Sequence, residues 1–147
     1  MIYLKTDEEI ELLRENNLLV SRALAEVGKH IRPGVTTREL DKIAEEFIRD
    51  NGAEPAFLGY QGYPASACIS VNEQVVHGIP GDRVIEEGDI VSVDLGTFLK
   101  GFVGDSAYTF AVGDVGEEAR RLLDVTKEAL CKGTAQAKAG NRVGDIS

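Results

Sequence analysis

The segment from residue 88 to residue 110 constrains the fold most strongly. It contains two runs rich in apolar and β-branched residues, and Lys100-Gly101 separates them. Two extended runs joined by a two-residue connection are typical of a β-hairpin, and the length of the connection sets the register of the strands. We therefore expect an antiparallel pair of strands on either side of Lys100-Gly101.

Two aspartates fall on the same face of this predicted hairpin. The register sets Asp94 opposite Ala107 and Asp105 opposite Gly96, and side chains alternate between the two faces. Asp94 also interrupts an apolar run, where an ionised carboxylate is costly unless it is paired or binds a metal. Two carboxylates that repel each other favour a cation between them, so the pair indicates a divalent-metal site. The alternative is two unrelated acids on a solvated face.

Composition limits the classes of function. The chain has 147 residues, which is enough for one domain with a core. Its net charge is −9, so it lacks the basic surface that nucleic acids require. No run is long and apolar enough for a membrane span and no signal peptide is visible, so we expect a cytoplasmic protein. Cys68 and Cys131 match no disulfide framework or zinc motif, and we expect each to be free and buried.

The remaining patterns predict an α+β chain. Thr6 with Glu9 and Thr36 with Glu39 are capping boxes, each followed by an apolar stripe of helical period. Between residues 54 and 112, short apolar runs separated by turn signals predict four or five strands. A third helix is expected from about residue 116 to 138.

A weak internal repeat relates the two ends of the chain. Ala23–Leu40 aligns with Ala129–Ile146, each with a helix followed by a glycine turn. A repeated unit of this size suggests two related halves. We expect residues 1–147 to form one catalytic-type domain, with a first repeat over about 1–112 and the start of a second over about 113–147. The second copy stops early, which predicts that the chain is the first part of a longer protein.

Two further segments are candidates for a binding site. Residues 59–64 place Tyr60 and Tyr63 in a glycine-rich loop, which is a candidate pocket wall, with plain loop packing as the alternative. Residues 66–71 read as a core strand. His77 follows it and is expected at a strand end; a lone histidine is more often structural, but this is a position where function is common.

Together these motifs resemble a known family. His77-Gly-Ile-Pro comes first, Val-Asp94-Leu-Gly follows, and Gly-Asp105-Ser-Ala-Tyr-Thr-Phe comes last. This order, the Tyr-x-Gly-Tyr-Pro loop and the opening Lys-Thr-Asp-Glu-Glu-Ile resemble type I methionine aminopeptidases over essentially the whole chain. The resemblance implies an α+β pita-bread fold, of which this chain would be the first of two pseudo-symmetric halves, with an antiparallel sheet and covering helices.

The resemblance also implies roles for individual residues. Asp94 and Asp105 match two ligands of a dinuclear site for divalent metals, with Co, Mn, Fe or Zn as candidates. His77 matches the histidine that contacts the substrate near the scissile amide and assists catalysis. The pocket for the methionine side chain would be lined by Tyr60, Tyr63, Cys68 and Phe57. Two positions depart from the family pattern: Phe57 replaces a frequent Cys, and Gln61 a frequent His.

The implied activity is hydrolysis of the N-terminal methionine from nascent proteins in the cytoplasm. The ribosome is a candidate partner, and the full-length enzyme would be a monomer. The family completes its site with a His and two Glu that would lie beyond Ser147, so we expect this chain to be inactive alone. Three alternatives are a related peptidase that cleaves before proline, a metal-free module on the same scaffold that binds peptides or proteins, and an inactive fragment.

Overall fold

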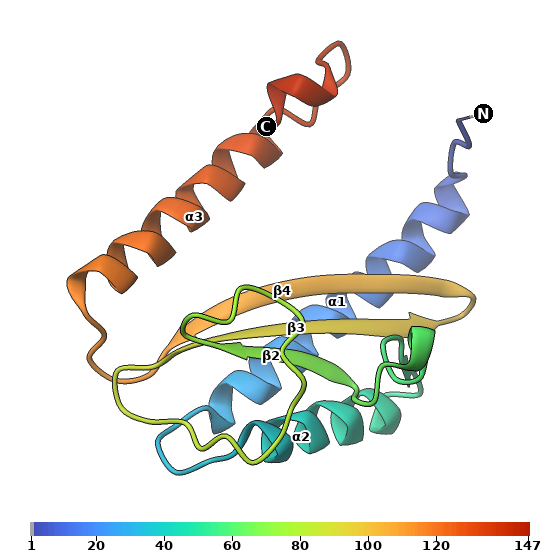
Figure 1. Ribbon diagram of the computed structural model, residues 1–147. Coiled ribbons are helices and arrows are strands. Elements are labelled where there is room, and N and C mark those ends of the chain that lie inside the picture. The colour runs from blue at the N-terminus through green and yellow to red at the C-terminus, as the bar shows by residue number, and fades with distance from the viewer. Residues whose placement is uncertain (1) are drawn as a thin grey trace. The chain divides into compact units, whose positions relative to one another are not determined.

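The computed structural model describes residues 2–147. The chain divides into two compact units, one ending at Asp114 and the other spanning Val115–Ser147. The first contains two helices, four strands and a short 3-10 helix: α1 (Asp7–His30), α2 (Thr37–Asp50), β1 (Glu54–Pro55), the 3-10 helix Tyr60–Gly62, β2 (Ala67–Val71), β3 (Ile90–Leu99) and β4 (Phe102–Ala111) (Figure 1). The second contains α3 (Glu117–Ala135) and the 3-10 helix Val143–Asp145.

Both predicted capping boxes are present. The Thr6 hydroxyl accepts the Glu9 N–H, and the Glu9 carboxylate accepts the Thr6 N–H. Thr36 and Glu39 make the same pair of bonds at the start of α2. These bonds satisfy N–H groups that have no partner within a helix, which is why both helices begin at these positions.

The predicted hairpin is confirmed, including its register. β3 lies between β4 on one side and β1 and β2 on the other, and all pairs are antiparallel. Asp94 pairs with Ala107 and Gly96 with Asp105. Lys100 and Gly101 have φ values of 51° and 86°, and two left-handed residues in a two-residue loop match the twist of the strands.

The two faces of the sheet have different environments. The face that carries Ile69, Val93 and Leu95 is buried, and α1 and α2 pack against it. In Figure 1, α1 passes behind the strands and α2 lies below them in the view. Asp94 and its neighbour in the register, Cys68, point from the opposite face. The alternation of side chains therefore separates the hydrophobic core from the face that bears the carboxylates.

A buried asparagine joins α1 to the hairpin. Asn16 is fully buried, and its Nδ2 donates to the carbonyls of Thr97 (3.2 Å) and Phe102 (2.7 Å). Its Oδ1 accepts the Thr97 hydroxyl. α1 also approaches β4 at Gly104, where a Cβ would lie 3.1 Å from Cγ of Asn16. Asn16 thus fixes the helix against both strands, next to the residue that precedes Asp105.

Two sequence expectations are wrong. His77 does not end a strand: β2 stops at Val71, and Asn72 has a φ of 53°, which takes the chain out of the extended conformation. Cys131 is not buried, although Cys68 is, as expected. A cysteine is buried only where its element has a covered face, and α3 has no buried residue.

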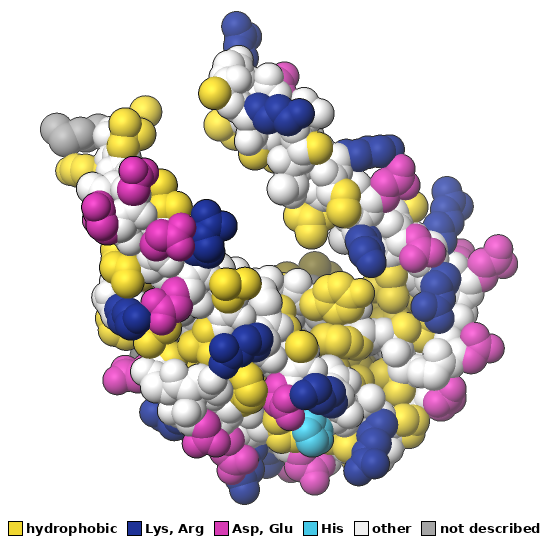
Figure 2. Space-filling view, turned by 180° about the vertical axis from the view of Figure 1, so that it is seen from behind, with side chains coloured by type: hydrophobic (Ala, Val, Ile, Leu, Met, Phe, Trp, Pro, Cys, Tyr) yellow, Lys and Arg dark blue, Asp and Glu magenta, His cyan; other side chains and the backbone are white. Residues whose placement is uncertain are grey.

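None of the helices in the described part of the chain is long and apolar enough to cross a membrane. On the face seen in Figure 2, basic and acidic side chains are interspersed. That face therefore offers no continuous basic surface to a polyanion.

The Asn16 network yields a stability prediction. Asn16→Ala removes three hydrogen bonds and leaves the buried Thr97 carbonyl and the partly buried Phe102 carbonyl without this donor, so it should lower the free energy of unfolding by about 2–4 kcal/mol. The matched control is Asn17→Ala, because Asn17 is exposed and bonds no buried group: its Nδ2 donates to the Leu13 carbonyl within α1, and its Oδ1 accepts the Asp105 N–H only at 3.4 Å. Urea unfolding measures both variants, and equal losses of stability would contradict the role given to Asn16.

Candidate functional site

An open pocket of about 590 Å³ lies on the face of the sheet that bears the carboxylates. Its volume is in the range of ligand-binding pockets. The structure brings together in it every residue that the sequence singles out as a site candidate, and Gln61, Gly62, Pro64 and Ile79 join them. The candidates are Phe57, Tyr60, Tyr63, Cys68, His77, Asp94 and Asp105.

The hairpin supplies the acidic side of this pocket. Asp94 comes from the middle of β3 and Asp105 from β4, one diagonal step away. Gly96, opposite Asp105, leaves space for an aromatic ring: a Cβ at this position would lie 2.5 Å from a ring carbon of Phe57. The register thus places two carboxylates beside an apolar wall.

Burial and repulsion act on Asp94. Its Oδ1 is buried, and no hydrogen-bond donor reaches it among the described residues. Burial raises the pKa of the Asp94 carboxyl, and the negative charge of Asp105 raises that pKa further. His77 acts in the opposite direction, because a positive imidazole favours the carboxylate. The Asp94 Oδ1 therefore has no hydrogen-bond donor among the described residues, and the effect of His77 does not offset those of burial and Asp105.

This environment fits a divalent cation. A buried carboxylate oxygen without a donor, beside a second carboxylate, is the oxygen-donor arrangement that hard cations prefer. Asp94 and Asp105 are the residues that could hold such an ion. Within residues 2–147, however, no group of three or more His, Cys, Asp or Glu side chains could hold a metal. The pair is a partial ligand set.

His77 reaches the pocket from the loop between β2 and β3. The loop, residues 72–89, passes in front of the sheet in Figure 1. His77 has a φ of 59°, which non-glycine residues seldom adopt, and its side chain is exposed. A strained backbone at a pocket residue is a feature of functional sites.

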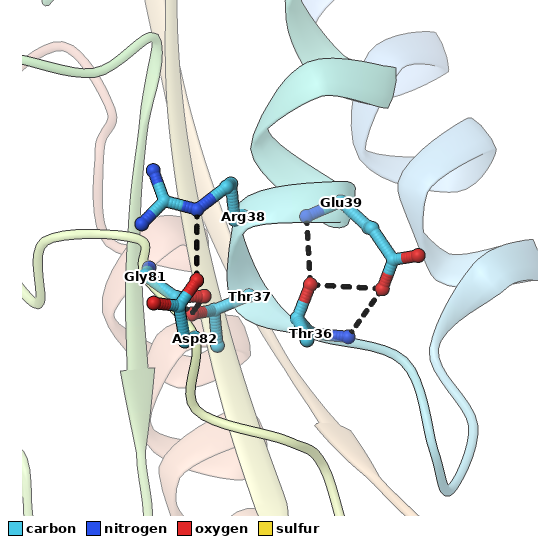
Figure 3. A network of polar contacts seen from close by, with 6 residues as sticks. All are labelled: Thr36, Thr37, Arg38, Glu39, Gly81 and Asp82. Atoms are coloured by element: carbon cyan, nitrogen blue, oxygen red, sulfur yellow. Dashed lines mark hydrogen bonds and ion pairs between the residues drawn. The ribbon is translucent and has the colours of Figure 1, made fainter.

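The middle of this loop is fastened to the start of α2 (Figure 3). The Thr37 hydroxyl accepts the Gly81 N–H at 2.9 Å and lies 3.1 Å from its carbonyl, and the Arg38 N–H donates to that carbonyl at 2.9 Å. Arg38 also pairs with Asp82, Nε to Oδ1, at 3.0 Å. The helix that covers the core thus also holds the loop that carries His77.

Aromatic residues and a buried thiol form the remaining wall. Tyr60 is largely exposed, whereas Tyr63 is half-buried and its hydroxyl lies 2.9 Å from the Ala67 carbonyl and 3.1 Å from the Gly78 carbonyl. Burial raises the pKa of both Tyr63 and Cys68. Both groups are therefore neutral at pH 7, and this side of the pocket is suited to an apolar group.

Sequence reasoning missed Asp41, which supports this wall. Its Oδ1 accepts the N–H groups of Ser66 (2.9 Å) and Ala67 (2.8 Å), at the start of the strand that carries Cys68. Burial raises the pKa of Asp41, and these two hydrogen bonds oppose the rise. No local pattern marks it, because an acid beside the apolar stripe of α2 looks like any residue at the border of an amphipathic helix.

Comparisons with known proteins agree with the geometry. A family model, metallopeptidase family M24, matches residues 11–147. Methionine aminopeptidase 1 of Bacillus subtilis is 50% identical over 147 residues, which are 100% of this chain and 59% of that protein. The methionine aminopeptidase of Clostridium acetobutylicum is 51% identical over 148 residues, again covering 100% and 59%.

Solved structures show the same fold. The methionine aminopeptidase of Thermotoga maritima superposes with a TM-score of 0.96 and 44% identity over 99% of this chain and 59% of that one. A prolidase from Pyrococcus furiosus superposes with a TM-score of 0.86 and 28% identity, over 97% of this chain and 41% of that one. These neighbours confirm the expected pita-bread fold, and the chain spans less than two thirds of their length and of the curated relatives' length. The match over nearly all of its residues shows that this chain belongs to metallopeptidase family M24.

Proposed function

We propose that this chain provides part of the active site of a metal-dependent aminopeptidase that removes methionine from the N-terminus of nascent proteins in the cytoplasm. The observation that carries the proposal is the position of Asp94 and Asp105 beside His77 in a pocket with an aromatic wall. Relatives with about 50% identity are named methionine aminopeptidases. We further propose two repeats, residues 1–112 and one that begins at about residue 113.

The metal would be held by Asp94 and Asp105. Two divalent ions, with Co, Mn, Fe or Zn as candidates, are the cofactor that the family resemblance implies. Bound in this pocket, such ions would supply a Lewis acid and a water of lowered pKa for peptide hydrolysis. Because residues 2–147 offer no group of three or more ligands, the complete site needs further side chains.

The other pocket residues would handle the substrate. Tyr60, Tyr63, Phe57 and Cys68 would surround the methionine side chain and exclude water, since this wall is apolar and neutral. His77 would donate a hydrogen bond to the scissile amide and stabilise the charge that develops there. The bulk of Phe57 beside Gly96 would make the pocket shallower than one with a cysteine at this position.

A proline-directed peptidase is the competing activity, because a prolidase shares the fold. Sequence identity favours methionine removal, because the chain is 50% identical to a methionine aminopeptidase and 28% identical to the prolidase. The tyrosine-rich loop also favours methionine, since its rings suit a long thioether side chain. The substrate experiment below separates the two activities.

The raised pKa of Asp94 yields a pH prediction. A carboxyl whose pKa is higher in the folded chain than in the unfolded chain stabilises the fold while it is protonated and destabilises it when it ionises. Without metal, the folded chain should therefore lose stability as pH rises from 3.8, the ordinary pKa, through the raised pKa of Asp94. Above that window, Asp94→Asn should be more stable than the unaltered chain. Thermal melts between pH 4 and pH 8 in a chelating buffer measure the difference.

Added metal should make the unaltered chain more stable than Asp94→Asn. Mn²⁺ raises the melting temperature only where a site exists, so it should stabilise the unaltered chain and leave Asp94→Asn unchanged. The stabilisation should fade as pH falls, because protons compete for the same oxygens. Asp50→Asn, which removes an exposed acid at the end of α2, is the control for net charge and should behave as the unaltered chain. Equal responses of all three would contradict the site.

Activity can be tested by supplying the missing ligands. We expect the 147-residue chain alone to release no methionine from Met-Ala-Ser with Co²⁺ or Mn²⁺. A chimera that continues from residue 147 into the remaining part of the Bacillus subtilis relative should release it. In the chimera, His77→Ala should lower kcat by roughly 10²-fold or more. Glu73→Ala, an exposed residue of the same loop, is the matched control.

Two results would contradict these expectations. Turnover by the chain alone would show that two carboxylates suffice as ligands. Cleavage of an Xaa-Pro dipeptide by the chimera, with no release from Met-Ala-Ser, would assign the proline-directed activity instead.

A further inference from the structure

The direction of the His77 side chain depends on its backbone. Among the described residues, no hydrogen bond is made by the imidazole or by the His77 main chain. The neighbouring apolar side chains of the loop also give little support: Val75, Val76 and Ile79 are 86%, 64% and 63% exposed. Something beyond local packing must hold His77 at a φ of 59°.

Gly78, the next residue, is held by bonds on both sides. Its N–H donates to the Ser70 hydroxyl at 3.0 Å. Its carbonyl accepts the Ile69 N–H at 2.9 Å and lies 3.1 Å from the Tyr63 hydroxyl. The N–H bond attaches the peptide unit that follows His77 directly to Ser70 of β2, and the carbonyl bonds hold the next peptide unit.

The close approach is tight enough to require glycine. A Cβ at Gly78 would lie 2.2 Å from the Ile69 carbonyl oxygen. Residue 78 is therefore buried against β2, while His77 beside it projects into the pocket. The bond from Ser70 is the side-chain contact that fixes the plane of the peptide between them.

Ser70 is placed for this bond. It lies on the same face of β2 as Cys68 and is 3% exposed, yet it does not line the pocket. Its hydroxyl is therefore not available to a substrate. A buried hydroxyl that accepts a buried N–H costs stability and order when it is removed, because the N–H is left without a partner.

We propose that Ser70 is a positioning residue for His77: its hydroxyl holds the 77–78 peptide and so aims the imidazole at the reacting amide. This inference rests on the proposed aminopeptidase activity and adds a residue to it. Ser70 touches neither substrate nor metal and acts through His77. A misplacement of about 1 Å is enough to reduce the rate by roughly 100-fold.

The first experiment needs no activity. His30 and His77 are the only two histidines, so their imidazole NMR signals can be assigned in the 147-residue chain. Ser70→Ala should speed hydrogen exchange of the Gly78 amide about tenfold or more and should shift or broaden the His77 signals, leaving those of His30 unchanged. Ser70→Thr, which keeps the hydroxyl, should restore both.

The matched control is Ser92→Ala. Ser92 pairs with Ser70 across the two strands, and its hydroxyl bonds Thr109 at 2.8 Å instead of the loop. This variant removes one hydroxyl from the same sheet and should leave Gly78 and His77 as they are. If Ser70→Ala does not fold, exchange in the unaltered chain decides: a Gly78 amide as fast as that of exposed Val75 overturns the proposal.

The second experiment is a double-mutant cycle in the chimera. Ser70→Ala should lower kcat roughly tenfold or more with little change in KM, and should have no further effect when His77 is already alanine. The same loss in both backgrounds would mean that Ser70 does not act through His77. A His77→Ala variant with full activity would instead refute the proposed role of His77, while the NMR result would still report whether Ser70 holds it.

Discussion

The antiparallel register of β3 and β4 is the constraint on which the rest of this site depends. The left-handed turn at Lys100 and Gly101 sets it, and the register brings Asp94 and Asp105 to one face of the sheet. A shift of one residue would move all side chains of a strand to its other face and would bury a carboxylate in the core. The turn therefore determines the chemistry of the pocket as well as the path of the chain.

The helices on the opposite face make this arrangement rigid. Asn16 of α1 bonds the backbone of both strands of the hairpin, and the start of α2 holds the loop that carries His77 at Gly81. On the face away from the core, burial of the Asp94 carboxyl and the charge of Asp105 raise the pKa of Asp94, whose Oδ1 has no donor among the described residues. A bound cation would relieve that cost, so metal binding would stabilise the fold.

Features set by local patterns could be predicted from the sequence. The capping boxes at Thr6 and Thr36, the hairpin register and the shared face of the two aspartates follow from turn chemistry and side-chain alternation. The position of His77 in a left-handed loop, the support from Asp41 and the bond from Ser70 could not be predicted. Each depends on where the loop backbone passes rather than on a local sequence pattern, and the Asp41 bond also joins segments far apart in the chain.

The central claim is that Asp94 and Asp105 together bind a divalent metal. The most direct measurement is an anomalous difference map from crystals of the chimera, which supplies the further ligands, grown with Mn²⁺ and collected near the manganese absorption edge. The account predicts an anomalous peak in the pocket within coordination distance of both carboxylates, and no such peak for Asp94→Asn. A manganese peak away from both aspartates, or an empty pocket at saturating Mn²⁺, would contradict it.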